Sequence, residues 1–143
     1  MKSQDAPVLI HETFHTSKES LWEALTKVEK MRLWFFDNIP SFKAQVGFKT
    51  QFTVKVEDRE FIHLWEITEV IPNQLITYNW KYEGYPGDSF VTFKLTEETD
   101  HIKLQLSHRV VESFPDQIPE FSRSSCLQGW TYFINQQLKG YLS

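Results

Sequence analysis

The stretch FKTQFTVKVEDREFIHLWEITEVIPNQLITYNWKYEGYPGDSFVTFKLTEETDHIKLQLSHRV, residues 48–110, decides the fold, because apolar and polar residues alternate along most of it. A period of two is the pattern of strands that bury one face and expose the other. Turn sequences at residues 58–59, 72–73, 83–88 and 98–99 divide the stretch into segments. The stretch therefore predicts five consecutive strands in an antiparallel meander.

The turn positions also predict which residues face one another across neighbouring strands. The predicted opposite pairs are Phe52 with Trp65, Val54 with His63, Ile67 with Tyr78, Trp65 with Trp80, Trp80 with Val91, Tyr78 with Phe93, Phe93 with Leu104, Val91 with Leu106 and Ser89 with His108. All these pairs keep the apolar residues on one common face, which a slip of one residue in any hairpin would undo. Glu69 is the exception, since this register turns it inward; either it lies in water at the end of the sheet or the turn is irregular.

Helical patterns flank the sheet. Residues 7–15 alternate loosely as a first strand, and Thr16-Ser17-Lys18-Glu19 fits a capping box that starts a helix. Apolar spacing then indicates this helix and a second short one, through Leu21, Trp22, Leu25 and Val28, and through Met31, Trp34 and Phe35. From Pro119 to Leu142 a long helix is expected, with an apolar stripe of Leu127, Trp130, Ile134, Leu138 and Tyr141 that Cys126 and Phe133 widen. Only the concave face of the sheet is large enough to cover that stripe.

Two details of these helices carry further expectations. Trp34, Phe35 and Phe36 are consecutive aromatic residues. On a helix they cannot all point inward, so at least one is expected to face solvent, the mouth of a cavity or a partner. Gly129 costs a helix about 1 kcal/mol relative to alanine, which indicates a close approach of the long helix to the sheet or to a bound molecule.

The composition is that of a globular protein, with 143 residues, 41% hydrophobic and 24% charged. This length predicts one domain, residues 1–143. Aromatic residues make up 15% of the chain, which suits a wide core or a lined cavity. The net charge of -4 argues against nucleic-acid binding, and neither a signal peptide nor a membrane span is visible. The lone Cys126 fits a reducing compartment, so a cytoplasmic location is expected.

The order of strand, two short helices, sheet and long helix resembles the helix-grip fold of the START-like (SRPBCC) superfamily, in its branch of homologues of the activator of the heat-shock-protein ATPase. Local matches are SLWEALT (residues 20–26), MRLWF (31–35), WEITEVIP (65–72), LITYNW (75–80), VTFKL (91–95) and GW (129–130). The resemblance implies an α+β fold, with a curved antiparallel sheet of roughly six to seven strands, two short helices and one long C-terminal helix. These elements are expected to enclose a deep cavity that often holds a hydrophobic small molecule.

The inward-facing residues predict the lining of such a pocket. The residues expected to contact a ligand are His63, Trp65, Tyr78, Trp80, Val91, Phe93, His108, Trp130 and Phe133. Apolar walls with a few polar tips are typical of small-molecule sites. The alternative is plain core, in which the two histidines are hydrogen-bonded to backbone or hydroxyl groups; Ser89 is the expected neighbour of His108.

Three functions are open at this point. The leading hypothesis is the binding of a hydrophobic or aromatic small molecule. A second is a co-chaperone-like module that contacts a larger ATPase or forms a homodimer, and a third is a cyclase- or hydratase-type enzyme with a pocket histidine as acid or base. No catalytic, cofactor or metal site is predicted, because Cys126 has no neighbouring base, the histidines lack metal-binding spacing and no phosphate-binding glycine pattern occurs.

Overall fold

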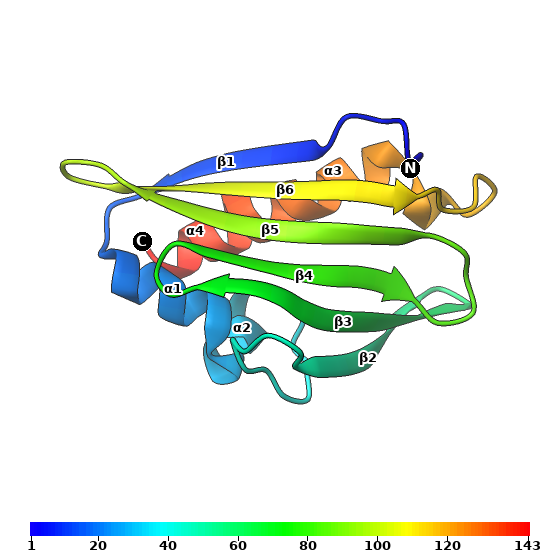
Figure 1. Cartoon of the computed structure of the whole chain (residues 1–143), viewed down its shortest axis with the longest axis horizontal. Coiled ribbons are helices and arrows are strands. Elements are labelled where there is room, and N and C mark those ends of the chain that lie inside the picture. The colour runs from blue at the N-terminus through cyan, green and yellow to red at the C-terminus, as the bar shows by residue number, and fades with distance from the viewer.

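The alternating stretch forms five consecutive strands of one curved antiparallel sheet, and the strand before the helices joins its edge (Figure 1). The computed structural model describes all 143 residues. The order across the sheet is β1-β6-β5-β4-β3-β2. The strands span Val8–Phe14 (β1), Lys49–Val56 (β2), Arg59–Ile71 (β3), Leu75–Tyr82 (β4), Asp88–Glu97 (β5) and Ile102–Glu112 (β6). The predicted α+β class and the meander are confirmed.

The helices lie on one face of this sheet, with the C-terminal segments running behind β5 and β6 in Figure 1. They span Lys18–Thr26 (α1), Val28–Trp34 (α2), Pro119–Phe121 (η1, a 3-10 turn), Arg123–Trp130 (α3), Thr131–Leu138 (η2, a π-helix) and Lys139–Tyr141 (α4). The cap of α1 is Ser17, whose Oγ accepts a hydrogen bond from the Ser20 backbone N–H at 3.1 Å. The capping box predicted to start at Thr16 is therefore wrong by one residue. None of these helices combines the length and the hydrophobicity that crossing a bilayer requires.

In the second hairpin the predicted register is correct up to a β-bulge. Trp65 faces Trp80 and Ile67 faces Tyr78. The register then shifts between Ile67 and Glu69, and the Glu69 side chain lies exposed. An irregularity before the turn thus places this carboxylate in solvent, where the charge keeps its hydration.

The other three hairpins are displaced by two residues from the prediction. The first turn consists of Glu57 and Asp58, and Glu57 adopts a left-handed φ of 58° that such tight turns favour. The pairs observed in place of the predicted ones are Phe52 with His63, Val54 with Phe61, Trp80 with Ser89, Tyr78 with Val91, Phe93 with Leu106, Val91 with His108 and Ser89 with Val110. A shift of two residues preserves the face on which each side chain lies, so the inward-facing set is the predicted one.

The C-terminal helix departs from the predicted stripe because its middle is a π-helix. Trp130, Ile134 and Leu138 are buried and follow one another at intervals of four residues, which the wider i→i+5 turns of a π-helix accommodate. Leu127 is 46% exposed and Tyr141 is 37% exposed. These two residues therefore lie outside the buried stripe, contrary to the prediction.

Candidate functional site

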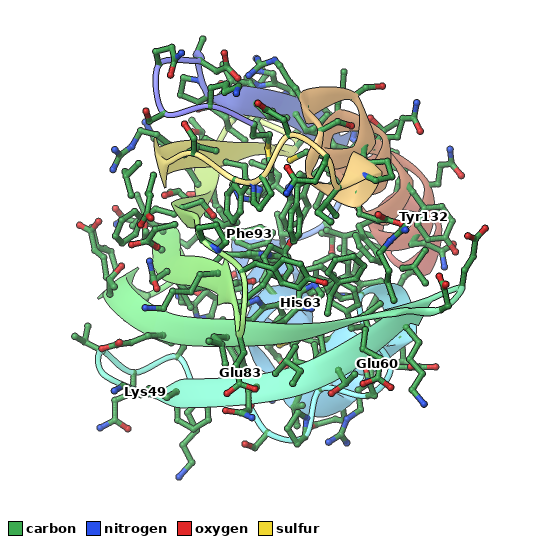
Figure 2. All side chains as sticks on the ribbon, turned by 90° about the vertical axis from the view of Figure 1, so that its right-hand side faces the viewer. Lys49, Glu60, His63, Glu83, Phe93 and Tyr132 are labelled. Atoms are coloured by element: carbon green, nitrogen blue, oxygen red, sulfur yellow. The ribbon has the colours of Figure 1, made fainter.

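A hollow of about 130 Å³ lies between the sheet and the C-terminal helix. Strands β3, β4 and β6 supply one wall, α3 and η2 supply the opposite wall, and Phe36, which follows α2, closes a further side. Figure 2 shows His63 in the interior, between the sheet and the helical layer. The volume is close to that of a cavity of about 150 Å³ known to hold one benzene ring, and below the roughly 300–1,000 Å³ of ordinary ligand pockets.

The nine predicted ligand contacts divide into two groups. Five of them line the hollow: His63, Trp80, His108, Trp130 and Phe133. The other four, Trp65, Tyr78, Val91 and Phe93, are buried in the main core and do not border the hollow. The inner face of the sheet is thus a lined hollow at one end and packed core at the other.

One end of the inner face of the sheet is packed solid because aromatic residues at the end of α2 point into the core. The helix ends at Trp34, and Phe35 leaves helical geometry with φ -108° and ψ -137°. This break lets Trp34 and Phe35 both be buried while Phe36, half-buried, lines the hollow. The Phe35 ring lies 5.5 Å from that of Trp65 and 5.6 Å from that of Trp130. Phe35 therefore occupies space where a deeper cavity was expected from the sequence.

His108 is the centre of a closed hydrogen-bond network. Its Nε2 lies 2.9 Å from Ser89 Oγ, and the Ser89 hydroxyl donates to the Trp80 carbonyl at 2.6 Å. Trp130 Nε1 donates to His108 Nδ1 at 3.0 Å, with Cys126 Sγ also 3.4 Å from that nitrogen. Because Nδ1 accepts, Nε2 carries the proton and the ring is neutral. Burial lowers the pKa of His108 to about 3, so the ring stays uncharged at neutral pH. His108 therefore acts as a neutral hydrogen-bonding link between β6 and the C-terminal helix.

His63 has one ring nitrogen free. Its Nδ1 lies 3.1 Å from the Phe61 carbonyl, so Nδ1–H donates there and Nε2 keeps a lone pair with no protein partner. The ring stacks on Phe52 with centroids 5.0 Å apart and planes at 15°. Burial lowers the pKa of His63 to about 4, which keeps the ring neutral. Tyr82 lies beside it, at 4.8 Å between ring centroids; its Oη accepts from Trp80 Nε1 at 2.8 Å, which leaves the Tyr82 hydroxyl proton free.

Two polar atoms remain unpartnered at the packed end. Trp65 Nε1 and Tyr78 Oη are buried without a hydrogen bond, beneath Phe35 and Phe42, whose rings pack on them. Burial also raises the pKa of Tyr78 well above its usual value. Leaving a buried hydrogen-bond donor without a partner lowers the free energy of unfolding by about 1–3 kcal/mol. This end of the core is therefore stabilised by aromatic packing rather than by hydrogen bonds.

The remaining reactive groups are not arranged for covalent or metal chemistry. Cys126 lines the hollow, but burial raises the pKa of its thiol to about 12, so the nucleophilic thiolate is scarce at neutral pH. No group of three His, Cys, Asp or Glu side chains converges on a common point. Gly129 borders the hollow, and a side-chain carbon at its position would meet no other atom within 4 Å. Gly129 therefore leaves open space and does not mark a close approach to the sheet; the other predicted possibility, a bound molecule beside Gly129, stays a prediction.

A larger groove of about 340 Å³ lies on the sheet at β2, β3 and β4, among polar residues that include Lys49, Gln51, Glu66 and Lys81. Its side chains are largely solvated, and Lys49 lies 4.0 Å from Glu66 as a loose surface ion pair. Such pairs contribute little to binding energy. Only Leu64 and Trp65 among the residues that line the groove are hydrophobic, so the inner hollow, with its aromatic walls, is the better candidate site.

Seven residues of the hollow lie outside the predicted set of ligand contacts: Met1, Phe36, Tyr82, Glu120, Ser125, Cys126 and Gly129. Tyr82 continues the inward series of Tyr78 and Trp80 on β4 at a spacing of two residues, and that alternation could have identified it. Phe36 belongs to the run of three aromatic residues of which at least one was expected to face solvent, a cavity mouth or a partner, and it does line the hollow. Periodicity does not single it out within that run, because it lies beyond the end of α2. The predicted neighbour of His108 is confirmed, since Ser89 contacts it from a diagonal position in the adjacent strand.

Comparison with known proteins supports the helix-grip assignment. Residues 15–143 match the model of a family described as Activator of Hsp90 ATPase homolog 1-like protein. No curated protein matches the sequence. The predicted resemblance to the branch of heat-shock ATPase activator homologues is confirmed by this match.

Solved structures share the fold along nearly the whole chain. Protein CV1439 from Chromobacterium violaceum is 19% identical, with a TM-score of 0.79 over 95% of this chain and 96% of that one. The Aha1 dimer from Colwellia psychrerythraea is 19% identical, with a TM-score of 0.70 over 96% of each chain. DynU16, a protein of the dynemicin biosynthetic locus, is 21% identical, with a TM-score of 0.75 over 96% of this chain and 47% of DynU16.

Proposed function

This chain belongs to the family of Activator of Hsp90 ATPase homolog 1-like proteins, and from that premise we propose that it binds a small, largely apolar molecule in the hollow between the sheet and the C-terminal helix. The observation that carries the proposal is the hollow itself, which has aromatic walls and borders His63, whose Nε2 has no protein partner. The buried side-chain atoms without a hydrogen bond are Trp65 Nε1 and Tyr78 Oη, so His63 Nε2 is accessible from the hollow, where a ligand can reach it. The lone free Cys126 agrees with action in a reducing compartment such as the cytoplasm.

The structural relatives are compatible with this role. DynU16 comes from a biosynthetic locus, where small organic molecules are the substrates and products. The shared helix-grip fold places a sheet and a helix around a common interior, and sites between such layers are frequent places for ligands. Fold alone does not transmit a function, so the proposal rests on the hollow of this chain.

Native mass spectrometry of freshly purified protein tests the proposal. The wild-type protein is expected to carry a non-covalent adduct that disappears on mild denaturation. The Gly129→Leu variant, in which a bulky side chain borders the hollow, is the matched control and should lose the adduct. If no adduct is found, soaking with single-ring compounds and following the indole N–H signals of Trp80 and Trp130 by NMR decides; unchanged signals for every compound would refute the proposal.

The acid–base alternative is disfavoured by the state of the two histidines. Both ring nitrogens of His108 are engaged inside the protein. His63 has a free nitrogen, but its pKa of about 4 lies far from the near-neutral value that suits a general acid or base at physiological pH. A hydrogen-bonding role for His63 fits its environment better than proton transfer.

A protein-interaction role is the second candidate. The family description refers to activation of the Hsp90 ATPase, and a relative was solved as a dimer. Leu33 on α2 is 65% exposed and Val46 before β2 is 62% exposed, so both are available to a partner. Stimulation of purified Hsp90 ATPase activity that the paired substitutions Leu33→Asp and Val46→Asp abolish would support this role; light scattering would reveal a homodimer.

A further inference from the structure

We infer that the hollow selects a neutral, single-ring molecule that carries a hydroxyl group, a ligand of the phenol class, whose O–H donates to His63 Nε2 and whose oxygen accepts from the Tyr82 hydroxyl. This inference rests on the proposed small-molecule function and specifies the ligand. It is carried by the size of the hollow, by the polar atoms left available in it and by its charge environment.

The size limits the ligand to about one ring. The hollow measures about 130 Å³, and a cavity of about 150 Å³ holds benzene. Phe36, Trp80, Trp130 and Phe133 supply aromatic walls. Aromatic rings prefer tilted and edge-to-face contacts with one another, as the existing pairs Phe36–Phe133 at 61° and Trp80–Trp130 at 62° illustrate. A flat ring suits these walls better than a branched aliphatic group.

The polar atoms prescribe one donor and one acceptor on the ligand. The indole N–H groups of Trp80 and Trp130 are already donated to Tyr82 Oη and His108 Nδ1, and His108 Nε2–H is bonded to a serine hydroxyl. What remains beside the His63 ring is the lone pair of His63 Nε2 and the hydroxyl proton of Tyr82; the Ser125 hydroxyl, which also borders the hollow, belongs to α3 on the opposite wall. The rings of His63 and Tyr82 lie 4.8 Å apart, and no hydrogen bond joins them directly. A single hydroxyl group between them can accept from one and donate to the other.

The charged groups that border the hollow are already engaged within the protein. Both carboxylate oxygens of Glu120 are bonded to Arg59, at 3.1 and 2.8 Å, and the Met1 α-ammonium donates to the Phe121 carbonyl at 2.7 Å. The histidines of the hollow are neutral, so an anionic ligand such as a carboxylate would lose hydration without gaining a cation from either ring. A cation would face the same loss, because the only acidic side chain is already paired.

The test is a titration of the wild-type protein with phenol, toluene and benzoate by calorimetry, with NMR of the Trp80 and Trp130 indole N–H groups to locate the compounds. Phenol and toluene have nearly the same shape, so their comparison isolates the hydroxyl group. Phenol is expected to bind about tenfold more tightly than toluene, since two additional hydrogen bonds form. Benzoate is expected not to bind. Equal affinities for phenol and toluene would overturn the inference even without any variant.

Variants assign the preference to the two polar atoms. His63→Phe and Tyr82→Phe each keep a ring of similar shape and are expected to bring phenol and toluene to within about threefold of each other. Tyr85→Phe removes a neighbouring hydroxyl outside the hollow and should leave the tenfold preference intact. An unchanged preference in both His63→Phe and Tyr82→Phe would overturn the inference.

Gly129→Leu separates the two levels of the proposal. If toluene and phenol bind equally and Gly129→Leu blocks both, the hollow is a small-molecule site without the assigned selectivity, and only the ligand class is wrong. If neither compound shifts the indole signals, or if both bind with unchanged affinity to Gly129→Leu, the hollow is not the binding site and the proposed function fails as well.

Discussion

Acid is expected to destabilise this protein well above the pH at which its carboxylates titrate, because two histidines are buried in the neutral state. His63 is 5% exposed with a pKa lowered to about 4, and His108 is 3% exposed with a pKa lowered to about 3. Both would titrate at about 6.5 in the unfolded chain. Between pH 6.5 and the folded-state values the unfolded state binds more protons, so the free energy of unfolding falls as the pH falls.

The magnitude follows from the width of that window. Each histidine contributes a slope of about 1.4 kcal/mol per pH unit below 6.5. Lowering the pH from 7.5 to 5.0 therefore costs about 2 kcal/mol per histidine, or about 4 kcal/mol for both. Surface carboxylates with lowered pKa, such as those of Glu23 and Asp116, act only below about pH 4.5 and leave this window to the histidines.

Urea unfolding followed by tryptophan fluorescence at pH 7.5, 6.5, 5.5 and 5.0 measures the effect. His63→Phe keeps the aromatic stack on Phe52 but removes one titrating group, so its loss over the same range should fall to about 2 kcal/mol. Phe52→Leu is the control, since it weakens the same contact without removing a titrating group and should retain the full loss. Stability that stays flat between pH 7.5 and 5.0, or an undiminished loss in His63→Phe, would refute the reasoning.

Three further outcomes are expected. Gly129→Ala should raise the free energy of unfolding by about 1 kcal/mol in thermal or urea unfolding, because alanine favours the helix and its methyl group meets open space; a loss of stability would show that the space is needed. Ser89→Ala should cost about 2–4 kcal/mol, because it strands a buried N–H of His108 and removes the donor to the Trp80 carbonyl; a cost below about 0.5 kcal/mol in urea unfolding would mean the network is not formed. Phe36→Ala should lower the free energy of unfolding by about 2 kcal/mol, less than the loss expected for a fully buried phenylalanine. The variant should also bind two-ring compounds such as 2-naphthol, which the wild-type hollow excludes. A calorimetric titration that shows no binding of 2-naphthol would contradict the assignment of Phe36 as a wall.

The face of each strand could be predicted from the sequence, while the pairing across hairpins could not. Alternation has a period of two, so displacements of two residues in three hairpins left every inward residue inward. The displacement arose at turns such as Glu57–Asp58, where a glutamate adopts the left-handed conformation that sequence preferences assign to Gly, Asn or Asp. The bulge before Glu69 left one trace in the sequence, because the regular register turns that glutamate inward and an irregular turn was one of the two explanations. Its position stayed hidden, because nothing in the local composition marks an extra residue in a strand.

The site was predictable only as far as periodicity reached. Five of the nine expected contacts line the hollow, and Tyr82 extends their pattern. The extent of the hollow, however, depends on Phe35 and Phe36, which follow the last residue of α2 and are placed by backbone geometry outside any regular element. The direction of the chain after a helix end is set by tertiary packing. The local sequence therefore predicts that three consecutive aromatic residues cannot share one helical face, but it does not predict where each side chain lies.

The polar atoms of the interior that have hydrogen-bond partners, and those that lack them, explain why ligand binding is expected at one end of the space between the sheet and the C-terminal helix. His108 ties β6 to the C-terminal helix through bonds that use its whole capacity, so that part of the wall is fixed. At the packed end, Trp65 Nε1 and Tyr78 Oη lack partners, but the rings of Phe35 and Phe42 pack on them, and exposing them would mean removing a buried ring from the core. At the other end, His63 Nε2 has no protein partner and is accessible from the hollow. A ligand beside His63 would therefore pair with a free group without displacing a core side chain, and this asymmetry, rather than the family fold, is the reason for proposing the site there.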